Sequence, residues 1–108
     1  MTYLKHLSAI VFLMMMSAAF SAQAEAVWVD VRSEREHKKD HIAGDIRIDH
    51  RDAVRELSRL YPDKDTEIYI YCAVGGRAGK AASALSEAGY TRVVNVGGIN
   101  DARKARGL

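Results

Sequence analysis

The single cysteine of this chain, Cys72, begins a loop that contains two glycines and ends in an arginine. An apolar, β-rich segment, 67–71, precedes the loop, and a segment of small residues typical of a helix, 78–85, follows it. Backbone N–H groups of a strand-to-helix loop converge on one point, and the helix N-terminus adds partial positive charge there. Both effects favour the thiolate, the nucleophilic form of cysteine. The pattern therefore predicts a nucleophilic Cys72 and an anion-binding loop of Ala73, Val74, Gly75, Gly76 and Arg77.

Two points about this loop stay open at the level of sequence. Arg77 can pair with a substrate oxyanion, or it can fix the loop by pairing with buried acids. Cys72 itself could be a buried, inert cysteine. We favour a functional thiol because of this loop context. The export signal described below also predicts an oxidising compartment, where a lone cysteine is at risk of mispairing and its presence suggests a use.

The first residues have the composition of an export signal. Lys5 and His6 form a weakly basic region, residues 7–20 are apolar, and Ala22-Gln23-Ala24 is a small-x-small cleavage site. An uncleaved membrane anchor is the less favoured alternative, because a spanning helix needs about 20 apolar residues. We therefore expect residues 1–24 to be a signal peptide and residues 25–108 to form a single small domain. This predicts a periplasmic protein without stable membrane association after cleavage.

The charge of the chain is nearly balanced, with 16 Lys and Arg against 14 Asp and Glu, and predicts no nucleic-acid surface. Arg51, Arg55 and Arg59 form a stripe at helical spacing, which is typical of a solvated helix face. No second cysteine and no histidine pair has metal-ligand spacing, so we predict no metal and no cofactor. The expected partners are small molecules, and the sequence does not indicate the oligomeric state.

Strands alternate with helices along the expected domain, which predicts an α/β fold with a small parallel sheet flanked by helices on both faces. In such sheets, sites lie at the carboxyl ends of the strands, where Cys72, Asp30 and Arg32 are all placed. The expected strands are 27–31, 45–48, 67–71 and 92–96. The expected helices are 33–40 (a short helix or a loop), 50–60 with Asp49 as its N-cap, 78–88 ended by Gly89, and 100–106, with turns at 62–65 and 97–98.

Five short motifs, in their order and spacing, resemble rhodanese-homology domains, and in particular the small exported single-domain rhodaneses of the phage shock protein E type. The motifs are Asp30-Val31-Arg32 with Glu36 (D-V-R-x-x-x-E), His41-Ile42-Ala43-Gly44 (H-I-x-G), residues 72–77 (C-x-x-G-x-R), residues 85–90 (L-x-x-x-G-Y) and Asn95-Val96-Gly97-Gly98 (a late double-glycine turn). The resemblance covers essentially all of residues 25–108. Asp45 and Asp49 depart from the family pattern, which usually has alanine and proline at these positions.

The resemblance implies a rhodanese-like fold and a sulfurtransferase that moves sulfane sulfur from thiosulfate, or a similar donor, to cyanide or a thiol acceptor. In this scheme Cys72 becomes a persulfide, and the backbone of residues 73–77 cradles the outer sulfur. Asp30 and Arg32 would be supporting residues that pair near the loop, and Glu36 and His41 would belong to the scaffold.

Two other functions stay open. One is a non-catalytic rhodanese-like sulfur carrier or binding module. The other is a cysteine phosphatase or arsenate reductase, which is less favoured because the phosphate cradle of cysteine phosphatases needs one more residue between the cysteine and the arginine.

Overall fold

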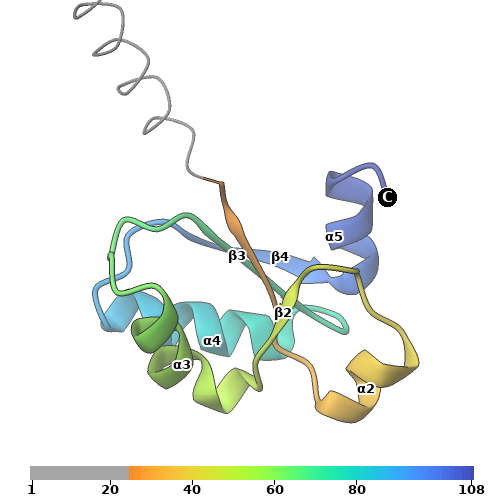
Figure 1. Cartoon of the computed structure of the whole chain (residues 1–108), viewed down its shortest axis with the longest axis horizontal. Helices are drawn as coiled ribbons and strands as arrows, with labels where there is room; N and C mark the ends of the chain where they lie inside the picture. Colours follow the sequence, from red (N-terminus) through yellow and green to blue (C-terminus); the bar gives the residue numbers. More distant parts are fainter. Residues whose placement is uncertain (1–24) are drawn as a thin grey trace, which may run out of the picture.

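The computed structural model describes residues 25–108, and the predicted signal peptide, residues 1–24, lies outside the described residues. Four parallel strands form one sheet in the order β2-β1-β3-β4, with helices packed around it (Figure 1). This confirms the predicted fold class. The elements are β1 (Val27–Asp30), α2 (Glu34–Lys39), β2 (Ile46–Arg47), the 3₁₀ turn η1 (His50–Asp52), α3 (Ala53–Leu60), β3 (Ile68–Cys72), α4 (Gly76–Glu87), β4 (Val93–Gly98) and α5 (Ile99–Ala105).

The two faces of the sheet bury different sets of side chains. In Figure 1, α3 and α4 lie together on one face, and α5 lies on the other. The first face buries the main core, which includes Val29, Leu57, Ile70 and Leu85, all fully buried. The opposite face buries a smaller cluster of Ile42, Tyr71, Ile99 and Ala102. Side chains alternate between the faces along β3, so Tyr71 points toward α5 while Cys72 joins the main core.

The helix expected at 50–60 begins differently from the prediction. Asp49 is a cap, as expected, but its side chain accepts the backbone N–H of Arg51 at 3.0 Å and its carbonyl accepts that of Asp52 at 2.9 Å. A bond from residue i to i+3 closes a 3₁₀ turn rather than an α-helical one. The first turn is therefore η1, and the α-helix begins only at Ala53.

Most other boundaries differ from the prediction by one or two residues, and two of these differences lie next to Cys72. Helix α4 begins at Gly76 instead of residue 78, because Gly75 takes a left-handed conformation, φ +110°, and serves as its N-cap. The expected turn at Gly97-Gly98 belongs to β4 instead. The register shifts between Ile70 and Tyr71, so that one extra residue of β4 bulges out before Gly97 pairs with Tyr71.

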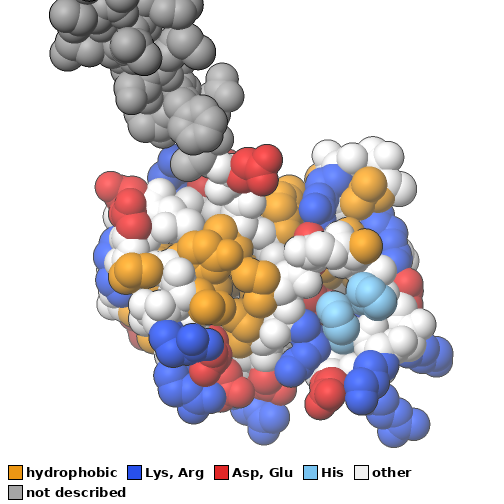
Figure 2. All heavy atoms as spheres, viewed as in Figure 1, with side chains coloured by type: hydrophobic (Ala, Val, Ile, Leu, Met, Phe, Trp, Pro, Cys, Tyr) orange, Lys and Arg blue, Asp and Glu red, His pale blue; other side chains and the backbone are white. Residues whose placement is uncertain are grey.

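The described surface carries charges of both signs, and Figure 2 shows them over α2 and α3. Each arginine of the stripe has a carboxylate partner. Arg51 pairs with Asp49 at 2.9 Å, Arg55 with Asp52 at 3.3 Å, and Arg59 with Glu56 at 2.8 Å. Within residues 25–108, no helix is both long and apolar enough to span a membrane.

Candidate active site

Cys72 is the last residue of β3, and its side chain is buried and forms no disulfide. Two backbone N–H groups point at its sulfur, from Gly75 at 3.0 Å and from Ala78 at 3.4 Å. Burial acts to raise the pKa of the Cys72 thiol. The backbone hydrogen bonds from Ala78, Gly75, Val74 and Arg77 outweigh it and bring the pKa below its usual value. The loop therefore stabilises the thiolate with peptide dipoles.

The loop wraps around the sulfur because it leads directly into α4. Gly75 is in the left-handed region, where residues with a Cβ are strained, and Gly76 begins the helix. The first turn of α4 thus presents the unpaired N–H groups of Arg77 and Ala78 toward the sulfur. At the tip of the loop, Val74 is 88% exposed, so an apolar side chain stands in solvent beside the buried thiol.

Arg77 is held by Glu36 of α2. Its Nη1 and Nη2 donate to the two carboxylate oxygens of Glu36 at 2.6 and 2.9 Å. The hydrogen bond from Arg77, followed by those from Ser33, lowers the pKa of Glu36 to about 2, and the contact with Glu36 raises the pKa of Arg77 above its ordinary value. Of the two sequence interpretations, this geometry matches a guanidinium that fixes the loop by pairing with an acid. The acid is only partly buried, however, since about a third of each side chain is exposed.

Glu36 also belongs to the capping box of α2. The backbone N–H of Glu36 donates to the Ser33 hydroxyl at 3.2 Å, and the Glu36 carboxylate accepts the backbone N–H of Ser33 at 3.1 Å. One carboxylate therefore caps its own helix and receives the arginine of the Cys72 loop.

Asp30 and Arg32 pair with each other at the end of β1. The Asp30 carboxylate is fully buried and accepts the Arg32 side chain at 2.9 and 2.7 Å and its backbone N–H at 3.0 Å. His37 lies 3.1 Å from the same carboxylate. Burial acts to raise the pKa of Asp30, and the hydrogen bonds from Arg32 and His37 outweigh it and lower the pKa. Arg32 also donates to the carbonyl of Asp40 at 2.6 Å, so the pair joins β1 to the end of α2.

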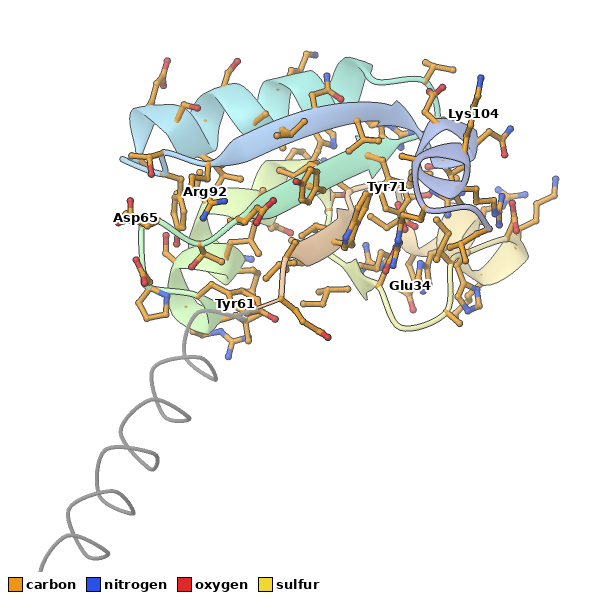
Figure 3. The ribbon with its side chains drawn as sticks, turned by 90° about the horizontal axis from the view of Figure 1, so that it is seen from above. Glu34, Tyr61, Asp65, Tyr71, Arg92 and Lys104 are labelled. Carbon is orange, nitrogen blue, oxygen red and sulfur yellow. The ribbon has the colours of Figure 1, made fainter. Side chains whose placement is uncertain are left out.

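Next to Cys72 in β3, the hydroxyl of Tyr71 donates to Asp45 at 2.7 Å. Arg106, which follows α5, donates to the same oxygen at 2.7 Å and lies over the Trp28 ring at 4.3 Å. Figure 3 shows Tyr71 beside α5. Burial, followed by the contact with Asp45, raises the pKa of Tyr71 above its ordinary value. Asp45, a departure from the family pattern, thus fastens the C-terminal segment to the residue before Cys72.

Strand β4 lies against the other side of the loop. A Cβ on Gly98 would come within 2.3 Å of the Ala73 carbonyl oxygen, so only glycine fits there. Asn95 donates its side-chain amide to the Gly75 carbonyl at 3.1 Å. Sequence reasoning included Asn95 only in a turn motif and did not foresee this contact. The only available signal was Gly79, an isolated glycine inside a helical segment.

The structure also shows a surface cavity and a stacked histidine pair, and neither includes a residue of the Cys72 loop. A surface cavity of about 610 Å³ is lined by residues that include Trp28, Asp45, Tyr61 and Arg106, and none of the residues that line it comes from the Cys72 loop. His41 is stacked on His37 and lies 3.1 Å from its carbonyl oxygen. Across residues 25–108, the structure brings together no group of three His, Cys, Asp or Glu that could hold a metal ion.

Comparison with known proteins relates this geometry to one family. The rhodanese-like domain family matches residues 16–105. Thiosulfate sulfurtransferase PspE of Escherichia coli (strain K12) is 36% identical over 74 residues, which cover 68% of this chain and 71% of that protein. YrkF of Bacillus subtilis (strain 168), whose name proposes a sulfur-carrier role, is 34% identical over 63% of this chain and 36% of its own length.

Solved structures with a similar fold include proteins described as rhodaneses or thiosulfate sulfurtransferases. A structure described as a rhodanese with anions from E. coli has a TM-score of 0.67 and 35% identity, and the match covers 71% of this chain and 91% of that one. A thiosulfate sulfurtransferase from Pseudomonas aeruginosa has a TM-score of 0.68 and 30% identity over 83% of this chain and 17% of that protein. The chain therefore belongs to the rhodanese-like domain family.

Proposed function

We propose that this protein is a sulfurtransferase that carries sulfane sulfur on Cys72, with thiosulfate or a similar compound as donor and cyanide or a thiol as acceptor. The observation that carries the proposal is the pair of backbone N–H groups, from Gly75 and Ala78, that point at the buried Cys72 sulfur. Family membership and the match to a thiosulfate sulfurtransferase support it.

The reaction divides into two displacements at sulfur. The Cys72 thiolate attacks the outer sulfur of thiosulfate, a new S–S bond forms, and the old S–S bond breaks with its electron pair leaving on sulfite. Cyanide then attacks the outer sulfur of the persulfide, and thiocyanate leaves while the Cys72 thiolate is restored. Neither step transfers a proton, so no general base is needed once the thiol is ionised.

The loop contributes mainly by stabilising negative charge. In the free protein the N–H groups face the thiolate, and in the persulfide the backbone of residues 73–77 would face the terminal sulfur. Fixed dipoles of this kind need little reorganisation when charge moves from one sulfur atom to the next. Arg77, held by Glu36, keeps the last residue of the loop in place.

The same pairing weighs against a phosphatase or arsenate reductase. Such an enzyme needs its loop arginine to contact the oxygens of a bound tetrahedral anion. Two of the five N–H donors of Arg77, one on each terminal nitrogen, are instead directed at Glu36 and hold the guanidinium against α2. The loop is also one residue shorter than the phosphate cradle of cysteine phosphatases.

A sulfur carrier without efficient turnover is the second candidate, supported by the match to YrkF. The test is thiocyanate production from thiosulfate and cyanide by the purified domain and by Cys72→Ser. We expect many thiocyanate molecules per protein and none above background for the variant. Formation of one equivalent only would favour the carrier, and Cys72-dependent hydrolysis of an aryl phosphate would favour the phosphatase.

We also propose that the protein is exported, with residues 1–24 removed. The support is the composition of that segment in the sequence. Expression of the full chain in a Gram-negative host tests this. A periplasmic product that begins at Glu25 is the expected result, whereas an intact chain retained in the membrane or the cytoplasm would overturn the proposal.

A further inference from the structure

Asn95 lies on β4, outside the loop motif of residues 72–77, and contacts that loop. Its Nδ2 donates to the carbonyl oxygen of Gly75 at 3.1 Å, and its Oδ1 accepts the backbone N–H of Gly97 at 3.0 Å. We propose that Asn95 is a positioning residue: by holding Gly75, its amide aims the Gly75 N–H at the Cys72 sulfur. A role of Asn95 in turnover rests on the proposed function of Cys72, whereas its effect on the ionisation of the Cys72 thiol does not.

Gly75 is the residue of the loop that most needs an anchor. Its N–H lies 3.0 Å from the sulfur, and its φ of +110° is a conformation that glycine reaches but holds with little intrinsic preference. The Gly75 carbonyl also accepts the N–H of Gly79 at 2.9 Å, within α4. The amide of Asn95 adds a fixed point on the strand, outside the helix. Because both peptide groups of Gly75 share its Cα, an anchored carbonyl limits how far its N–H can turn away from the sulfur.

Gly79 explains how the amide reaches the loop. A Cβ at Gly79 would lie 3.3 Å from the Asn95 Nδ2, closer than most real Cβ contacts. Glycine is disfavoured inside a helix, and here it leaves room for the Asn95 side chain. The backbone of β4 also lies close to the loop, since a Cβ on Gly75 would lie 3.3 Å from the Cα of Gly97. The loop therefore packs closely on the bulge of β4. The missing side chain of Gly79 thus leaves space for the hydrogen bond between Asn95 and Gly75.

The test measures the ionisation of Cys72 directly, from the pH dependence of its alkylation by iodoacetamide. For Asn95→Ala we expect the thiol pKa to rise by about half a unit, the effect of weakening one hydrogen bond to the thiolate. Below the pKa, alkylation should then be about threefold slower at a given pH. Asn95→Asp removes the donor to Gly75 but keeps an acceptor for Gly97. At high ionic strength, which screens its added charge, it should behave like Asn95→Ala.

Asn100→Ala is the matched control, because Asn100 is an exposed asparagine whose side chain contacts Arg103 on α5 instead of the loop. It should leave the thiol pKa unchanged. An unchanged pKa in Asn95→Ala, even with a lower melting temperature, would reduce Asn95 to a structural residue and overturn the proposal. An equal rise in Asn100→Ala, or an Asn95→Asp protein with the original pKa, would overturn it as well. Because alkylation needs no sulfur donor, a protein that fails to form a persulfide still reports on Asn95.

Discussion

Arg77 and Glu36 join the Cys72 loop to α2 through two parallel hydrogen bonds, from Nη1 to Oε1 at 2.6 Å and from Nη2 to Oε2 at 2.9 Å. The hydrogen bond from Arg77, followed by those from Ser33, lowers the pKa of Glu36 from 4.5 to about 2. A carboxyl whose pKa is lower in the folded state contributes stability above its unfolded pKa, and this contribution is lost as the pH falls through the folded value. The ion pair should therefore weaken between about pH 4.5 and pH 2.

Glu36→Gln tests this relationship through urea unfolding at several pH values. Because about a third of each side chain is exposed, solvent screening limits the ion pair to about 0.5–1 kcal/mol near neutral pH. The difference in unfolding free energy between the protein and this variant should shrink as the pH falls from 4.5 toward 2. Glu34→Gln, on the exposed side of the same helix, is the control. A difference that is constant with pH would show that Glu36 does not act through its charge.

The glycines around the loop differ in what a methyl group would meet. At Gly98 a Cβ would collide with the Ala73 carbonyl oxygen at 2.3 Å, whereas at Gly76 it would meet nothing within 4 Å. We expect Gly98→Ala to lower the free energy of unfolding by about 1–3 kcal/mol, the usual effect of overpacking, and to slow alkylation of Cys72. Gly76→Ala should fold with unchanged or slightly greater stability, because alanine favours a helix. Equal stability of the two variants, measured by denaturant unfolding, would contradict the close contact between β4 and the loop.

Asp45 accepts a hydrogen bond from the hydroxyl of Tyr71, the buried residue before Cys72. Asp45→Ala removes the acceptor of the Tyr71 hydroxyl and leaves that group unpaired, which should cost about 1–3 kcal/mol. Tyr71→Phe removes the hydroxyl instead, so adding it to Asp45→Ala should restore part of the loss. Denaturant unfolding of the two single variants and the double variant measures the coupling. Additive losses would mean that the hydrogen bond is unimportant for stability.

The ionisation of Cys72 gives another prediction. Backbone hydrogen bonds outweigh burial and lower the pKa of its thiol. The rate of iodoacetamide alkylation should therefore reach half its maximum at a pH below the usual thiol value of about 8.5. The same reagent with the unfolded protein in urea supplies the reference. A folded protein that titrates at or above the unfolded value would show that burial dominates at this site.

The sheet and the loop that begins at Cys72 could be predicted because their signals are local. A β-rich segment, a cysteine, two glycines and a small-residue helix follow one another between residues 67 and 85. The resemblance to rhodanese-homology domains also implied the pairing of Asp30 with Arg32, which joins two residues only two positions apart.

Contacts between distant segments could not be predicted, because no local signal in the sequence indicates them. Glu36 and Arg77 are 41 positions apart, and several other acids could have served as the partner of Arg77. The role of Asp45 depends on α5 lying against its end of the sheet, which no motif records. The 3₁₀ turn at His50 and the β4 bulge arise from local hydrogen bonding and strand register, and the periodicity of side chains does not resolve either feature.

The most direct test of the central claim is intact-mass spectrometry of the purified domain before and after incubation with thiosulfate. We predict a gain equal to the mass of one sulfur atom, absent in Cys72→Ser and removed by cyanide. A protein with a demonstrably free Cys72 thiol that gains no mass from thiosulfate would contradict thiosulfate as the sulfur donor. The same result with other sulfane-sulfur donors would contradict the persulfide mechanism itself.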